Sequence, residues 1–298
     1  MSSSIPSSTS SSSAEPAVSV VIGSNAPRAL DVCLAALEPQ RDGAEVLVCE
    51  GEPSDDGLRS RFPWATFVAS PGALVPELWR DGIERSKGRI VALTIAQMVP
   101  AEDWLENVVR TQQEHDAVGG AIDPGEGLRL VDWAEYFCRY SRDMRPFSAS
   151  DDEELAGDNV AFKRDLLERH REHLKTGYWE PVLHPVLRRD GVVLWHTPEL
   201  VVRQGRSAGF AAFARQRLEH GRRYGHQRGE HFSRARNLIG VIAAPLVPLL
   251  MTVRVLRRVW AKRRFRRQAV VALPLIFAFN AVWAYAEARG HLDMLLHR

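Results

Sequence analysis

Short apolar runs alternate with helical patterns along the first half of the chain. Residues 18–22 (VSVVI) are a continuous apolar run rich in β-branched side chains, which is typical of a buried strand. The apolar positions that follow recur at helical spacing, at Leu30, Cys33, Leu34 and Leu37. Residues 45–49 (EVLVC) then repeat the strand pattern. A strand, helix, strand order with short connections predicts a parallel, right-handed crossover.

The same unit recurs further along the chain. A strand at residues 66–69, a helix at 76–86 and a strand at 90–94 are predicted. Ligands bind beyond the carboxyl ends of the strands in open parallel sheets, so residues 23–25, 50–56 and 94–98 should line one cleft. The pattern further predicts one more strand, three helices and a final strand, at residues 117–122, 131–140, 163–170, 180–189 and 192–195. We therefore expect an α/β domain, a mostly parallel sheet flanked by helices, over residues 17–206.

Two apolar segments near the end of the chain lie in a strongly basic region. Residues 238–253 and 269–286 are nearly free of charge, and their lengths fall at or just below the roughly 17 to 25 residues that span a bilayer. Residues 254–267 between them hold eight basic side chains. If both segments crossed, this stretch and the basic residues 215–236 would lie on opposite faces, against the positive-inside tendency. We expect apolar and basic helices over 207–298 that are interfacial or re-entrant, with arginines on anionic headgroups; a soluble hairpin buried in a dimer is the alternative.

The charge of the chain is divided between its two parts. Residues 205–298 contain 18 Lys and Arg against 4 Asp and Glu, whereas residues 1–204 contain 21 against 33. No nucleic-acid recognition motif accompanies the arginines, so we expect no nucleic-acid partner. Residues 1–16 are Ser-rich, lack the basic and apolar parts of a secretory signal, and are expected to be a disordered tail. The three cysteines have no CxxC spacing, which favours buried thiols in a reducing compartment.

Three segments carry a family resemblance. They are the strand and Ser/Asp-rich turn at residues 45–57, GDNVAFKRD at 157–165, and GYWEPVLHPVLRRDG at 177–191. Together they resemble family 2 glycosyltransferases, which have a GT-A fold, over about residues 18–206. The resemblance implies a nucleotide-sugar donor and places Glu50, at the end of the second strand, on the nucleotide base. It also assigns donor contacts to five further residues, Ser24, Asn25, Asp56, Thr94 and Gln97. For Glu50 alone, a solvated turn without function is the alternative.

The metal motif of that family is missing. After the strand at 90–94 the family usually has a D-x-D-like pair that holds a divalent ion on the diphosphate. This chain has TIAQM at 94–98, which offers no good ligand for a hard cation, and VVRQGRS at 201–207 also lacks the histidine that often follows the last strand. No metal ligand is therefore assigned, although Mg²⁺ or Mn²⁺ stays possible. The gap implies either lost activity or metal-independent transfer, with an arginine such as Arg203 or Arg206 replacing the charge of the ion.

The third segment supplies the candidate base. In the family an ED pair precedes a glycine by about eleven and twelve positions, and counting back from Gly191 places Glu180 on the second member, the base that deprotonates the acceptor hydroxyl. His184 would share its helix face and orient it. Trp179 would stack on a sugar or belong to the core. A first-turn carboxylate favoured by the helix dipole is the alternative for Glu180.

The acceptor side is assigned to the turn at GDN. The resemblance makes this turn lead into a helix, so that Asp158 and Asn159 face the cleft and the first N–H groups of the helix are available to an oxygen anion. A helix cap is the alternative for both residues.

These assignments predict an inverting glycosyltransferase. It would transfer a sugar from a nucleotide-sugar donor to a lipid-linked or polysaccharide acceptor at the cytoplasmic face of a membrane, and a homo-oligomer is possible. One alternative is a catalytically degenerate GT-A protein that acts as a binding or scaffold subunit in polysaccharide assembly. Another is a nucleotidyltransferase on a related sheet, which would require metal-binding carboxylates.

Overall fold

The computed structural model describes residues 16–206, 209–230 and 232–296. Its strands are β1 (Val18–Ser24), β2 (Ala44–Glu50), β3 (Thr66–Ala69), β4 (Ile90–Ile95), β5 (Met98–Pro100), β6 (Ala117–Pro124), β7 (Ser150–Asp151), β8 (Asn159–Lys163) and β9 (Leu194–Gln204). Its α-helices are α1 (Leu30–Leu37), α2 (Asp56–Arg61), α3 (Val75–Arg85), α4 (Trp104–Thr111), α5 (Leu130–Tyr140), α6 (Arg164–Arg169), α7 (Glu180–Arg189), α8 (Phe210–Glu230), α9 (Arg234–Ala243), α10 (Val247–Lys262) and α11 (Arg266–Leu296).

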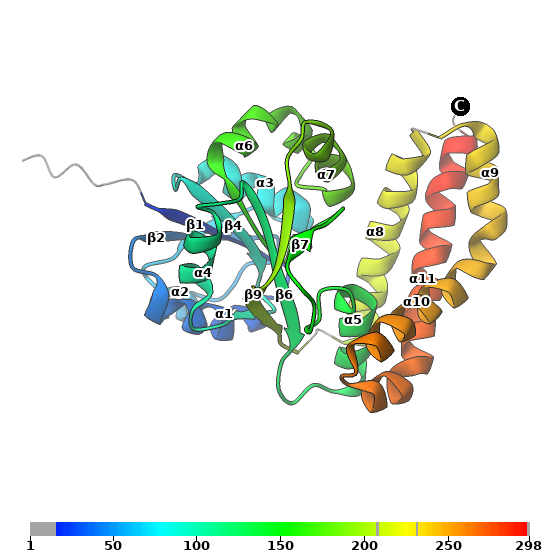
Figure 1. Cartoon of the computed structure of the whole chain (residues 1–298), viewed down its shortest axis with the longest axis horizontal. Helices are drawn as coiled ribbons and strands as arrows, with labels where there is room; N and C mark the ends of the chain where they lie inside the picture. Colours follow the sequence, from blue (N-terminus) through cyan, green and yellow to red (C-terminus); the bar gives the residue numbers. More distant parts are fainter. Residues whose placement is uncertain (1–15, 207–208, 231, 297–298) are drawn as a thin grey trace, which may run out of the picture.

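One curled sheet contains all the described strands. Its order is β3-β2-β1-β4-β8-β6-β9-β5, with β7 paired to β9. The block β3-β2-β1-β4 is parallel, and so is the β6–β9 pair, whereas β5, β7 and β8 run antiparallel to their neighbours. Helices α3, α6 and α7 lie on one side of the sheet and α1, α2 and α4 on the other (Figure 1). The predicted α/β architecture, with a sheet flanked by helices and apolar helices after it, is confirmed.

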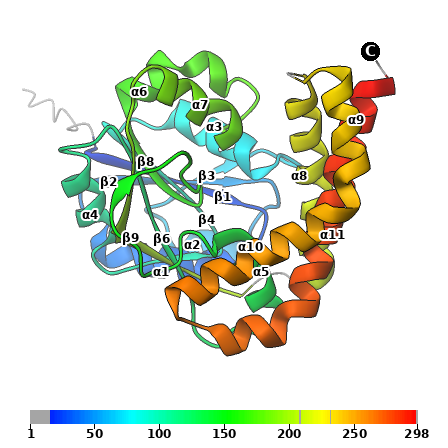
Figure 2. The ribbon, with the colours of Figure 1, turned by 45° about the vertical axis from the view of Figure 1, so that its right-hand side comes forward.

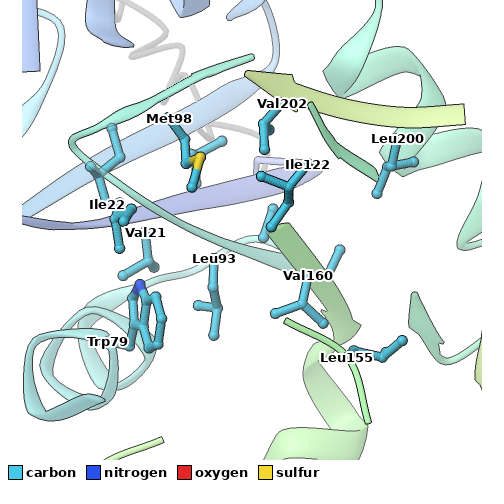
Figure 3. Close-up of a cluster of buried hydrophobic side chains, with 14 of the residues drawn as sticks. Val21, Ile22, Trp79, Leu93, Met98, Ile122, Leu155, Val160, Leu200 and Val202 are labelled. Carbon is cyan, nitrogen blue, oxygen red and sulfur yellow. The ribbon is translucent and has the colours of Figure 1, made fainter. Parts of the chain in front are cut away.

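The core explains why the strands read as continuous apolar runs. Both faces of the first strands are covered, so every residue of β1 is buried. Helix α3 lies directly on β1, since a Cβ at Gly82 would come within 2.1 Å of the Val21 side chain. Trp79 of the same helix donates a hydrogen bond to the Thr94 carbonyl at 2.7 Å. Figure 3 shows Trp79 beside the aliphatic side chains of the core, where this contact holds α3 over the end of β4.

Most predicted elements appear within one or two residues of their expected ends, and α7 has the predicted bounds. Two predictions were wrong in the second half of the sheet. The final strand was expected at 192–195, but β9 runs for 11 residues because it pairs with β5, β6 and β7. The GDN turn was expected to lead into a helix, but it leads into β8, which pairs antiparallel with β4 and β6; a helix follows only at Arg164.

The C-terminal helices form a bundle beside the sheet (Figure 2). Helices α8 and α11 approach so closely that a Cβ at Gly225 would lie 2.2 Å from the Glu287 carbonyl oxygen, and one at Gly290 would lie 2.3 Å from the Arg222 carbonyl oxygen. The bundle is joined to the α/β domain through α5, where Cys138 lies against the Ile276 carbonyl of α11. Helix α8 is thus fixed between the sheet domain and α11.

The turn between α10 and α11 is less available to lipid than the sequence predicts. Lys262 donates hydrogen bonds to the carbonyls of Arg142 and Met144, and Arg264 pairs with Asp123. These two cations therefore anchor the bundle on the loop after α5 and on the end of β6 instead of facing headgroups. The segments Arg234–Lys262 and Arg266–Leu296 are nevertheless long and apolar enough to cross a membrane, and only 17% and 39% of their most apolar windows are buried. Core helices of soluble proteins can pass the same test of length and composition.

Candidate functional site

A pocket of about 290 Å³ lies at the carboxyl ends of β1, β2 and β4. Asn25, Gly51 and Gln97 line it from the strand ends, and Leu74 and Val75 line it from the start of α3. Its opposite wall comes from two residues of α5 and from six residues of α8 in the C-terminal bundle: Glu135 and Arg139, with Ala212, Phe213, Arg215, Gln216, Glu219 and His220. The cleft predicted at the strand ends is present, and the C-terminal region forms one wall of it.

Two of the expected donor residues reach this pocket and two lie behind it. Asn25 lines the pocket while its amide donates to the Ala73 carbonyl at 3.0 Å. Gln97 also lines the pocket, and its backbone carbonyl accepts from the Gly205 amide at 2.7 Å. Ser24 and Thr94 are fully buried at the ends of β1 and β4. The Thr94 hydroxyl donates to the Asp158 carbonyl at 2.9 Å, so Thr94 holds the backbone of the GDN turn and does not face the pocket.

The remaining two donor residues point elsewhere. Glu50 ends β2 as predicted, but its side chain is completely buried. One carboxylate oxygen accepts from the Ser54 amide at 2.8 Å and the other pairs with Arg59 at 2.7 Å. The prediction of a base-binding carboxylate is corrected here, because both oxygens hold the turn after β2. Asp56 is exposed in the first turn of α2 and does not line the pocket.

Asp158 and Arg139 form the charged centre of the site. The Asp158 carboxylate accepts from Arg139 at 2.8 Å and from the Tyr140 hydroxyl at 2.6 Å, and it is nearly buried. Arg139 also pairs with Glu135, one helical turn earlier in α5, at 3.5 Å. Since Arg139 and Glu135 both line the pocket, Asp158 is connected to the pocket through Arg139.

Glu180 lies on the other side of the GDN turn. It is the first residue of α7, and one of its carboxylate oxygens accepts from the Gly157 amide at 3.1 Å. Burial raises the pKa of Glu180 to about 7, and the negative charge of Asp158 contributes to the increase. A carboxylate with a pKa near 7 is half deprotonated at neutral pH and can accept a proton there.

Trp179 and His184 have different surroundings from those expected. Trp179 is 7% exposed and meets the ring of His220 edge-on at 6.0 Å, which brings it to the α8 wall of the pocket. The His184 ring bonds the Leu155 amide and the Tyr178 hydroxyl, not Glu180. Burial lowers the pKa of His184 to about 3, so it is neutral and fixes the chain around Glu180 only indirectly.

Asn159 is a structural residue, which corrects its assignment to the acceptor. It is fully buried, its amide donates to the carbonyls of Ala121 and Leu200 at 3.0 Å each, and its oxygen accepts from the Trp104 indole at 2.9 Å. The GDN turn enters a strand, so Asn159 points into the sheet and joins β6, β9 and α4. No helix N-terminus stands at this turn.

We expect Asn159→Ala to destabilise the protein by about 3 kcal/mol, because three buried partners lose their hydrogen bonds at once. Thermal or urea unfolding measures this change. The exposed Gln113→Ala variant is the control and should unfold like the native chain. An Asn159→Ala protein of native stability but with a raised KM for an acceptor would restore the original assignment.

Sequence reasoning missed Arg139 and Arg215, the two Lys or Arg side chains in the described lining of the pocket. The helix containing Arg139 was predicted, but an apolar period does not tell which loop its polar face meets. Arg203 and Arg206, the predicted substitutes for a metal, are exposed and do not line the pocket; the Arg206 side chain bonds the Gly127 carbonyl instead.

The residues do not fit the divalent ion that this type of fold implies. Among residues 16–206, 209–230 and 232–296 there is no group of three or more His, Cys, Asp or Glu side chains that could hold a metal ion. Asp158, the carboxylate connected to the pocket through Arg139, cannot serve as a metal ligand without losing its bonds to Arg139 and Tyr140. We therefore derive no chemical step through a metal.

Two of the solved structures that resemble this chain are sugar transferases. The mannosyltransferase PcManGT from Pyrobaculum calidifontis, in complex with GDP-Man and Mn²⁺, is 16% identical with a TM-score of 0.49, and the match covers 96% of this chain and 87% of that one. GalNAc-T7, with UDP, GalNAc and Mn²⁺, is 13% identical with a TM-score of 0.49, and covers 64% of this chain; this chain matches 44% of it. No protein-family model and no curated protein matches the sequence. Both TM-scores are below 0.5, so neither likeness bears on substrate or metal.

Proposed function

We propose that the protein is an inverting glycosyltransferase of the family 2, GT-A type, which uses a nucleotide-sugar donor. The observation that carries the proposal is the position of Glu180. Its carboxylate, with a pKa of about 7, bonds the amide beside Asp158, and Asp158 in turn pairs with a pocket-lining arginine. Glu180 does not line the pocket itself, but these contacts connect the candidate base to a polar pocket at the carboxyl ends of parallel strands, where ligands bind in such sheets.

The chemistry needs one proton acceptor and one displacement. In the proposed reaction the acceptor hydroxyl oxygen attacks the anomeric carbon from the face opposite the phosphate, and Glu180 takes the hydroxyl proton. The bond from the anomeric carbon to the phosphate oxygen breaks, and the nucleoside diphosphate leaves with the bonding electrons. The new glycosidic bond has inverted configuration. Asn25 and Gln97 would contact the donor, and Trp179 and His220 the sugars.

The decisive experiment is a donor screen. The full chain, with anionic vesicles, is given UDP-, GDP- and dTDP-sugars, and release of the nucleoside diphosphate is measured with and without EDTA. Release from one donor class supports the proposal. If no donor of the panel releases its nucleoside diphosphate, the transferase assignment fails and the protein is better explained as a degenerate GT-A subunit that scaffolds polysaccharide assembly.

A lipid-linked or polysaccharide acceptor at the cytoplasmic face of a membrane is part of the proposal. It is supported by exposed apolar side chains along α9, the 3-10 turn η4 (Ala244–Leu246) and α10, namely Leu238, Ile239, Ile242, Leu246, Leu249 and Leu250, which are 50 to 68% exposed. We call these six residues the apolar strip. Arg234 and Arg236 precede it and Arg254 follows it. Such a strip between cations suits insertion into the surface of an anionic bilayer.

We expect the double variant Ile242→Asp, Leu246→Asp to bind anionic vesicles at least about tenfold more weakly, because burying each side chain contributes about 1.5–3 kcal/mol. Vesicle co-sedimentation measures the binding. Val193→Asp, at an exposed apolar residue of the α/β domain, is the control. Unchanged binding by the double variant would remove the strip from the membrane and favour a soluble bundle.

A further inference from the structure

The strand-end pocket contains two arginines near the segment where the family resemblance leads one to expect a metal. Gln97 lines the pocket from the short segment between β4 and β5, which replaces the missing D-x-D motif. Arg139 of α5 and Arg215 of α8 line the same pocket. The carboxylates that would hold an ion are absent from this segment, and two arginine side chains stand in the surrounding wall.

Arg139 is positioned before any ligand arrives. One of its terminal nitrogens bonds Asp158 at 2.8 Å and the other contacts Glu135 at 3.5 Å, and its side chain is 20% exposed. A guanidinium carries five N–H donors in a rigid plane, so these two contacts leave donors for a further partner. Arg139 can therefore offer hydrogen bonds to an anion in the pocket without rearranging its own partners.

Arg215, from α8, adds a second positive charge to the same wall of the pocket. It is exposed on the first turns of α8 and has no ion pair with any described residue. The helix that carries it is anchored two residues earlier, where the buried Phe213 meets Phe279 of α11 at 4.7 Å. A second anchor is the ion pair between Arg223 and Glu77 of α3, at 2.9 Å. These contacts fix α8 across the strand ends.

Three glutamates also line the pocket, against its two arginines, and one of the three is paired with an arginine. Glu135 is paired with Arg139, while Glu52 and Glu219 are exposed. Glu52 follows the end of β2, on the side where the family binds the nucleoside, and Glu219 is one helical turn beyond Arg215. At the start of α3 the Leu74 amide already donates to the Glu77 carboxylate at 2.7 Å, so the positive charge in the pocket comes from its arginines.

We infer that Arg139 and Arg215 bind the diphosphate of the donor and perform the charge neutralisation that a divalent cation performs in related transferases. Guanidinium groups match phosphate oxygens with paired, charge-assisted hydrogen bonds. The positive charge would stabilise the nucleoside diphosphate as it leaves. This inference rests on the proposed function and specifies how that site works without a metal.

The test compares nucleoside diphosphates with nucleosides. Binding of UDP, GDP and dTDP to the full chain is measured by calorimetry in EDTA, and binding of the corresponding nucleosides by ligand-observed NMR. We expect Arg215→Gln to weaken diphosphate binding about 10- to 100-fold and to leave nucleoside binding unchanged, because only the charge-assisted contacts are lost. Arg215→Lys should recover part of the affinity. Arg222→Gln, which removes the same charge from an exposed site on the same helix, should bind like the native chain.

The outcomes separate this inference from the proposed function. Diphosphate binding that requires Mn²⁺ and disappears in EDTA would overturn the arginine site and leave the transferase assignment standing. Native affinity in Arg215→Gln would overturn it as well. If no nucleotide or nucleoside binds under any condition, the proposed function itself fails, and the arginine site with it.

Discussion

Glu180→Gln should lower kcat by about 10²- to 10⁴-fold, the usual contribution of a general base. The substitution keeps the shape of the side chain and an oxygen that can accept from the Gly157 amide, but it removes the site for the proton. Donor binding should change little, so the loss should appear in kcat and not in the affinity for the nucleotide. Steady-state kinetics and calorimetry on the same preparation measure both quantities.

The pH profile gives an independent check on the same residue. Because the pKa of Glu180 is about 7, kcat/KM for the native chain should rise with pH and level off above that value. The residual activity of Glu180→Gln should lack this rise. Glu84→Gln is a suitable control, since Glu84 is an exposed carboxylate on α3. A native kcat in Glu180→Gln would exclude Glu180 as the base.

The raised pKa also affects stability, with a definite sign. Burial favours the protonated form of Glu180, so its contribution to stability is fully present below pH 4.5 and is lost as the pH rises through about 7. At pH 8 the native chain should therefore be less stable than Glu180→Gln by about 1–3 kcal/mol, whereas the two should be similar near pH 4.5. Thermal unfolding at the two pH values measures the difference.

Gly225→Leu should destabilise the protein by about 3 kcal/mol or more and should also weaken nucleotide binding. The new Cβ would lie 2.2 Å from the Glu287 carbonyl, a backbone atom that cannot move without displacing α11. Because α8 forms a wall of the strand-end pocket, separating the two helices should also displace Arg215 and His220. Thermal unfolding and calorimetry with nucleoside diphosphates measure the two effects.

Helix propensity alone would make Gly225→Leu more stable than the native chain, so a loss of stability can be attributed to the contact between α8 and α11. Replacing glycine by leucine inside a helix is favourable by close to 1 kcal/mol when the site is free. The control is Ala211→Leu, which adds a large side chain to an exposed position of the same helix. A Gly225→Leu protein as stable as the native chain would mean that α8 and α11 do not meet at this glycine in solution.

The parallel half of the sheet was predictable from the sequence for a physical reason. Strands buried on both faces must be apolar throughout, so β1, β2 and β4 stand out as short apolar runs, and their shared direction brings Asn25 and Gln97 to one edge. The position of Glu180 at the start of α7 followed from the helical pattern of residues 180–189, whereas its role as the base rests on its spacing to Gly191 and stays a prediction. Local pattern and register were sufficient for these residues.

The rest of the site depends on contacts between distant segments. Nothing near Glu50 in the sequence shows that Arg59 will cover its carboxylate, and the polar face of α5 gives no sign that Arg139 will meet Asp158. The antiparallel β8 was missed because VAFK is too short to distinguish a strand from the first turn of a helix. Arg215 was missed because residues 207–298 were interpreted as a membrane-associating region. In the structure, α8 of this region forms a wall of the strand-end pocket.

The wall that α8 builds has a consequence for how the proposed transferase could be divided by a protease. Many membrane-bound enzymes can be shed as active soluble fragments when a protease cuts the connection to their anchor. In this protein a cut between β9 and α8 would leave every described strand and Glu180 on one fragment, but Arg215 and His220 on the other. In the proposed transferase such a cut would therefore separate the candidate base from the arginine and histidine of the α8 wall, and one cleavage would remove both the proposed membrane segment and part of the proposed site.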